Sequence, residues 1–154
     1  GSCDYLDIFE APDADAATTE AAIASVHPAL EMVASPFTDR DAIHANVKLG
    51  DLQSNGAVVV GPALDPAIRA ALSTLPVALL LDGVAARSTQ TGASWDAIVK
   101  AVTWLAGHAA ARGLPLKQGQ VVITGSRALA PHGAARHIEG QMGDWGSVTA
   151  EMTY

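Results

Sequence analysis

Residues 104–126 read WLAGHAAARGLPLKQGQVVITGS, and this stretch decides the fold because a helix, a tight turn and a strand follow one another in it. From 96 to 111, apolar residues recur at helical spacing, which predicts a helix that buries one face. The expected buried stripe consists of Ile98, Ala101, Val102, Leu105 and Ala109.

Arg112 and Gly113 predict the end of this helix. A basic side chain suits the C-terminal end of the helix dipole, and glycine readily adopts the left-handed conformation that follows a last turn. The next apolar run, 121–123, is β-branched and lies between Gly119 and Gly125. It therefore predicts a short buried strand.

The chain before this stretch predicts further short strands and helices. Local composition favours a strand at 5–9, a helix over 14–26 that starts near Asp15, and a strand at 29–34. A short helix capped by Asp65, a strand at 77–81 and a hairpin turn at Asp82-Gly83 are expected next. The closing segment GDWGSV, residues 143–148, predicts a turn into a last strand.

Composition and charge restrict the class of protein. A chain of 154 residues with 49% hydrophobic residues can bury one core, so we expect residues 1–154 to form a single domain. Net charge is −7, and residues 1–41 carry nine of the 16 acidic residues but only one base, Arg40. This charge argues against nucleic acid as a partner, because phosphate binding requires a basic face.

Other sequence features point to a cytoplasmic protein that does not bind membranes. Cys3 is the single cysteine, so no internal disulfide can form. There is no signal-peptide pattern and no apolar run long enough to span a bilayer.

The order of motifs WLA, AARGLPLKQGQVVITGS, AP and GDWGSV resembles the C-terminal half of the fumarylacetoacetate hydrolase family, in its 2-keto-4-pentenoate hydratase and 4-oxalocrotonate decarboxylase branch. The resemblance implies an α+β fold, a strand-rich mixed β-roll with a few packed helices. It also implies a homodimer, and a chain that lacks the N-terminal region and lysine of the family.

Glu31 is the charge that the resemblance makes most informative. It interrupts the apolar run 29–34, and on pattern alone it is either a solvated residue on an outward face or a buried carboxylate that needs a partner. The segment HPALE, residues 27–31, is similar to the family motif PAxE, whose glutamate is a ligand of a divalent metal.

The remaining metal ligands of the family lie in an upstream ExELxF motif, which aligns Cys3 and Tyr5 with the two ligand positions. Asp7 and Glu31 are the candidate metal ligands if a site for Mg²⁺ or Mn²⁺ is retained. Otherwise no cofactor is required.

Further candidate site residues follow, some from the same resemblance and some from side-chain chemistry alone. Gly125 and Ser126 match the family motif TGS at a strand end, where small residues let a ligand approach the backbone. Gln53 and Ser54 fall in a segment similar to DNASxxxFxxG and are candidate substrate-binding residues. His132, and also His137, could act as a general base.

The expected function is that of a divergent hydratase or lyase. It would act on a small oxo or enol compound by acid/base proton transfer, with Glu31, Ser126 and His132 as catalytic residues. Two alternatives stay open: a metal-independent cyclase or isomerase of a biosynthetic pathway, and a non-catalytic subunit that pairs with a longer relative. In the first two cases the partner is a small-molecule substrate.

Overall fold

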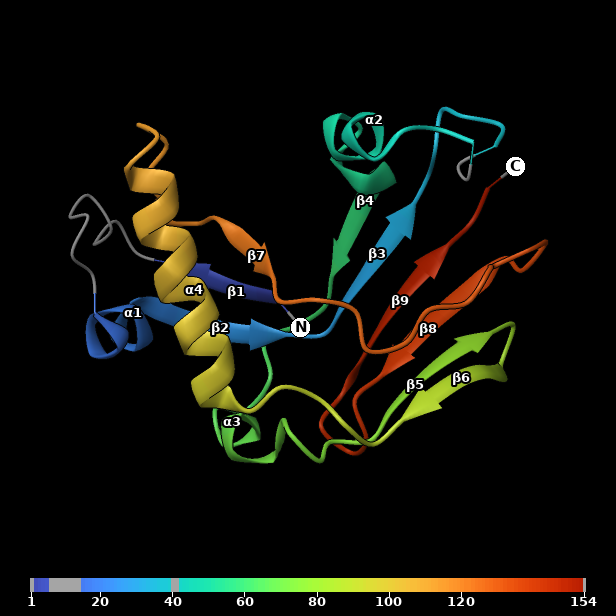
Figure 1. Cartoon of the computed structure of the whole chain (residues 1–154). Coiled ribbons are helices and arrows are strands. Elements are labelled where there is room, and N and C mark those ends of the chain that lie inside the picture. The colour runs from blue at the N-terminus through green and yellow to red at the C-terminus, as the bar shows by residue number, and fades with distance from the viewer. Residues whose placement is uncertain (1, 6–14, 40–41, 154) are drawn as a thin grey trace.

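The computed structural model describes residues 2–5, 15–39 and 42–153 of the chain. These residues form an α+β fold in which every strand pair is antiparallel (Figure 1). None of the helices in this part is long and apolar enough to cross a membrane.

The strands of the described residues form three sheets. Their orders are β2-β1-β7, β3-β4 and β6-β5-β8-β9. The bounds of the strands are β1 (Ser2–Tyr5), β2 (Ile23–His27), β3 (Ala29–Val33), β4 (Asn55–Val60), β5 (Val77–Leu81), β6 (Val84–Thr89), β7 (Val121–Ile123), β8 (His137–Gln141) and β9 (Ser147–Glu151).

Helices α1, α3 and α4 lie at one end of this assembly, whereas α2 lies beside β4 (Figure 1). The longest, α4, crosses the sheet formed by β2, β1 and β7, and its neighbour α1 lies at the same end of the molecule (Figure 1). The helices are α1 (Ala16–Ala22), α2 (Ala45–Gly50), α3 (Ile68–Ala71) and α4 (Trp95–Ala110), with a 3₁₀ turn, η2 (Leu52–Ser54).

Helix α4 confirms the helix expected before Arg112, but the buried stripe is displaced. Ser94 caps its first turn by accepting a hydrogen bond from the Ala97 N–H at 3.3 Å. Gly113 follows the helix with φ of +71°, as expected for a left-handed stop. The fully buried residues are Val99, Val102 and Ala106, whereas Ala101 is exposed, so that part of the predicted stripe is wrong.

The expected helix over 14–26 is wrong beyond Ala22. Asp15 does cap α1, since its carboxylate accepts from the Thr18 N–H at 2.8 Å. From Ile23 onward the chain is strand β2, because its backbone pairs with β1 in the register Tyr5↔Ile23 and Cys3↔Val26. Tertiary pairing has overridden the local propensity of an alanine-rich segment. Of the strand expected at 5–9, only Tyr5 lies among the described residues.

Two clusters of apolar side chains form the core. The larger lies between α4, α3 and β2 and includes Ile68, which is 1% exposed. The smaller lies between β3, β8 and β9 and is built from Leu30, Ile138 and Val148. Gly140 on β8 lets these layers approach closely, because a Cβ there would lie 3.2 Å from Leu30 Cδ2.

We expect the substitution Ile68→Ala to lower the free energy of unfolding by about 2–5 kcal/mol, because it removes apolar contacts and leaves a cavity in the larger core. Urea unfolding followed by circular dichroism measures this change. The matched control is Val84→Ala, at a residue 70% exposed, which should alter stability by less than about 0.5 kcal/mol. Equal effects of the two substitutions would contradict this assignment of the core.

Candidate functional site

Three of the predicted site segments line one cavity of about 440 Å³. Its walls come from β3, β5, β8 and the connection that follows β7. This first cavity is lined by Glu31, Gly125, Ser126 and His132, together with apolar side chains of the smaller core such as Leu79. The fold therefore brings together residues that lie about a hundred positions apart in the sequence.

Glu31 lies on β3 with its side chain exposed at this cavity, so it is not a deeply buried carboxylate. Its Oε1 accepts a hydrogen bond from Asn55 Nδ2 at 2.7 Å. Asn55 begins β4, the strand that pairs with β3, and the register shifts by a bulge between Met32 and Val33. An amide donor on one carboxylate oxygen fixes its orientation, and the other oxygen has no partner among the described residues.

Gly125 and Ser126 follow β7 and enter the first cavity as a sharp backbone turn. Gly125 has φ of +117°, a conformation that residues with a Cβ rarely adopt. The Ser126 hydroxyl donates to the Ala128 carbonyl at 3.3 Å, a long hydrogen bond. A ligand oxygen could replace this acceptor without leaving a buried group unpaired, because the Ser126 side chain is exposed.

His132 is half-buried in the wall of the same cavity. It lies in a turn in which its carbonyl accepts the Ala135 N–H at 3.0 Å. Its imidazole could take or return a proton there, as expected for a general base.

Gln53 and Ser54 lie outside this cavity lining, and their predicted role in substrate binding stays a prediction. Leu52, Gln53 and Ser54 have φ of +49°, +56° and +68°, an unusual run of three left-handed residues without glycine. Ser54 is 1% exposed, and its hydroxyl donates to Asp51 Oδ2 at 3.0 Å. Its carbonyl accepts from the Ala34 N–H at 2.8 Å, which ties this turn to the end of β3.

The described residues do not fit the family's metal site. They contain no group of three His, Cys, Asp or Glu side chains placed to hold an ion. Glu31 is the one candidate ligand within them, and its carboxylate is engaged with a neutral amide. Asp7, the other candidate ligand, lies outside the described residues. We therefore derive no chemical step through a metal.

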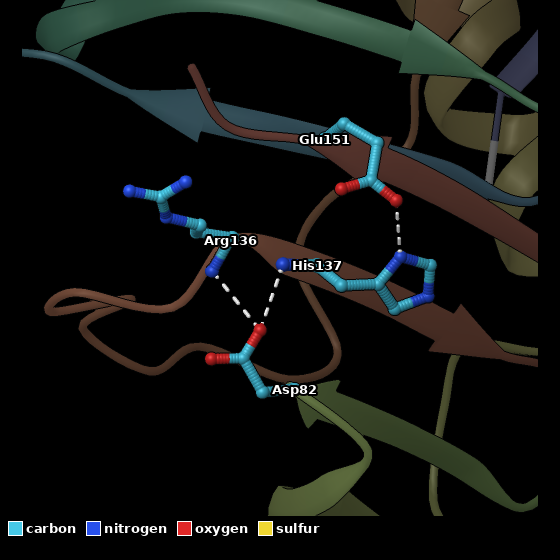
Figure 2. Close-up of polar contacts among 4 residues, drawn as sticks. All are labelled: Asp82, Arg136, His137 and Glu151. Atoms are coloured by element: carbon cyan, nitrogen blue, oxygen red, sulfur yellow. Dashed lines mark hydrogen bonds and ion pairs between the residues drawn. The ribbon is translucent and has the colours of Figure 1, made fainter. Parts of the chain in front are cut away.

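His137, also considered as a base, is not part of the first-cavity lining and lies in a polar cluster at the start of β8. Figure 2 shows its Nδ1 hydrogen-bonded to Glu151 Oε1, at 2.6 Å. Asp82 accepts from the backbone N–H groups of Arg136 and His137 at 3.0 and 2.9 Å, which fixes the start of β8 beside the β5–β6 turn. These two hydrogen bonds hold the pKa of the Asp82 carboxyl below its usual value. The antiparallel pairing of β5 with β6 confirms the hairpin predicted at Asp82-Gly83.

Sequence reasoning missed two polar residues of this region. Asn55 orients Glu31 and directly follows Ser54 in the sequence. Its position at the start of a strand could have indicated that it belongs to the site. Arg127 directly follows the TGS motif and also lines the first cavity. Its partners lie 36 and 52 residues away in the chain, so only the structure shows them.

Comparison with known proteins identifies the type of fold. No protein family model matches the chain. Among solved structures, it is similar to the 4-oxalocrotonate decarboxylase from Pseudomonas putida G7 complexed with calcium and acetate. The TM-score is 0.76 and the identity 23%, and the match covers 97% of this chain and 56% of that one.

The same decarboxylase complexed with magnesium and adipate matches with a TM-score of 0.79 and 22% identity, over 97% of this chain and 57% of that one. The chain thus spans a little over half the length of these relatives. The resemblance to the fumarylacetoacetate hydrolase family is confirmed at the level of the fold, which is that of its decarboxylase branch.

The pair of His137 and Glu151 predicts a pH-dependent stability. The hydrogen bond to Glu151 raises the pKa of His137 above its usual value of 6.5. A raised folded-state pKa gives a stabilisation that is complete below pH 6.5 and is lost as the pH rises through the folded-state pKa.

We therefore expect Glu151→Gln to destabilise the protein at about pH 5 and to have a smaller effect at about pH 8. Urea unfolding at both values measures the difference, and an NMR titration of His137 should show a lower pKa in the variant. A pH-independent difference between the two proteins would contradict this assignment.

Proposed function

We propose that this chain is a lyase- or hydratase-type enzyme that acts on a small oxo acid in the first cavity by acid/base proton transfer. The observation that carries the proposal is the convergence of Glu31, Ser126 and His132 on this one cavity. Similarity in fold to a 4-oxalocrotonate decarboxylase supports lyase-like activity on a small keto acid.

Glu31 is the proposed base. Asn55 holds one carboxylate oxygen, and the second can accept a proton from the carbon next to the carbonyl of an oxo acid. This transfer converts the ketone to its enolate and leaves Glu31 protonated. Return of the proton to the same carbon regenerates the substrate. In a substrate whose enolate is conjugated with a carbon–carbon double bond, return of the proton to the far carbon of that double bond gives an isomer.

Ser126 and His132 are the proposed acid and hydrogen-bond donors. The Ser126 hydroxyl can exchange its long bond to Ala128 for one to the substrate oxygen, which stabilises the negative charge of the enolate. His132 can supply the proton that completes the reaction or position a water for addition. Gly125 leaves open space beside these groups, since a Cβ there would meet no atom within 4 Å.

A metal-independent isomerase or cyclase is the second candidate. It is favoured by the arrangement at Glu31, where one carboxylate and one amide suffice for proton transfer. Both candidates share the first step, so one assay serves for both. The homodimer and the cytoplasmic location expected from the sequence remain predictions, of which light scattering tests the first.

We expect Glu31→Gln to slow enolisation by about 10²–10⁴-fold, because glutamine keeps the shape of glutamate but cannot accept the proton. Exchange of the C3 hydrogens of 2-oxobutanoate or 2-oxopent-4-enoate for deuterium, followed by proton NMR, measures this step directly. The thermal midpoint should change little, since the Glu31 side chain is exposed and glutamine can keep the bond from Asn55.

Glu151→Gln is the matched control, because it makes the same chemical change outside the cavity and should exchange at the wild-type rate. Exchange by Glu31→Gln at the wild-type rate would remove Glu31 from the mechanism. No exchange by the wild type would favour the non-catalytic subunit. Titration of Mg²⁺ into both proteins by calorimetry decides whether residues outside the described part complete a metal site with Glu31.

A further inference from the structure

A second cavity of about 380 Å³ adjoins the first and has no role in the proposed reaction. The two cavities share Gly125, Ser126, Arg127 and Met142 in their linings. The second cavity extends from this shared segment toward the larger core, where α3 and α4 pack.

Most side chains that line the second cavity are apolar, and the polar ones are four hydroxyl-bearing side chains, His27 and Arg127. The apolar side chains come from α3, the turn after it, α4 and the residue that follows β8. They include Ile68, Leu72, Trp95, Ile98 and Met142. Hydroxyl groups come from segments on either side of Arg127, namely Thr89, Thr91, Thr124 and Ser126. A ligand that fills this space needs an apolar body and one polar group.

Arg127 lines the second cavity and is held by two backbone carbonyls. Its NH2 donates to the Leu75 carbonyl at 2.6 Å, and its Nε donates to the Thr91 carbonyl at 3.3 Å. The third nitrogen, NH1, donates to no group of the described residues, and no carboxylate among them pairs with the guanidinium.

The guanidinium lies against Gly92, which also lines the second cavity. A Cβ at that position would lie 2.7 Å from Arg127 Cζ, so the absence of a side chain makes room for the charge. Partial burial lowers the pKa of Arg127, because the charged form has lost part of its hydration. A fixed, partly dehydrated cation with no carboxylate partner among the described residues favours an anionic ligand, and guanidinium groups match carboxylates in geometry.

We propose that the second cavity binds a monocarboxylate with an apolar tail, whose carboxylate lies at Arg127 and whose tail lies among the side chains of α3 and α4. A volume of about 380 Å³ falls within the range of small-molecule sites, about 300–1,000 Å³. This site goes beyond the proposed reaction in the first cavity and does not depend on it.

Fluorescence of Trp95 tests the proposal, because this tryptophan lines the second cavity and the other two do not. Replacing Trp104 and Trp145 with phenylalanine leaves Trp95 as the single reporter. We expect octanoate to change its emission saturably, and neutral octanol to bind roughly 10- to 100-fold more weakly, because it lacks the charge-assisted hydrogen bonds. Equal binding of octanoate and octanol would overturn the proposal.

Substitution of Arg127 separates its binding role from its structural one. Arg127→Met should weaken octanoate about 10-fold or more while octanol binding stays near that of the parent. The matched control is Arg136→Met, because the Arg136 side chain is exposed and points away from its neighbours in Figure 2. It should bind octanoate like the parent protein.

Gly92→Ala provides a second variant if Arg127→Met fails to fold. The added methyl group would displace the guanidinium, whose side chain is long enough to move, and should also weaken octanoate selectively. Unchanged octanoate binding in either variant would overturn the proposal. Stronger octanoate binding in Glu31→Gln, which removes a negative charge from the first cavity, would place the ligand there and would overturn the proposal as well, whatever that variant does to enolisation.

Discussion

The antiparallel pairing of β5 with β8 is the constraint on which the rest of the structure depends. Strand β5 is central in the four-stranded sheet, and it contributes to both cores: Val77 is buried in the larger one, and Leu79 and Leu81 pack against the smaller one. Its partner β8 comes from the last part of the chain. Closing this long loop costs conformational entropy, which burial of these apolar side chains in the two cores offsets.

This pairing also positions the connection between β7 and β8, which runs past the sheet and past β3 (Figure 1). Because both ends of the connection are held in sheets, its glycine and serine are presented to the first cavity by a fixed frame. Glu31 reaches the same space from β3, whose position is set by Leu30 in the smaller core. The site therefore depends on packing that lies beneath it.

Local signals in the sequence predicted the elements that short-range interactions determine. The helix before Gly113, the turn at Asp82-Gly83 and the strand 121–123 are of this kind, because caps, glycine conformations and β-branched runs act within a few residues. The strand 121–123 is less buried than predicted, since Val121 is 42% exposed. The strand β2 was predicted as helix, because its identity depends on a partner strand that composition does not reveal. Glu31 and Ser126 were predicted from the family resemblance and His132 from the chemistry of imidazole, whereas the backbone carbonyls that hold Arg127 are long-range partners with no pattern of their own.

The segment Gly125–Arg127 is shared by two cavities, and this has a thermodynamic consequence. A ligand in either space that shifts the Ser126 backbone changes the shape of the other, so the two binding equilibria would be linked. Linkage of this kind is reciprocal: whatever factor one ligand imposes on the affinity of the second, the second imposes on the first. A three-residue stretch of backbone would then be enough to let one small molecule regulate the binding of another.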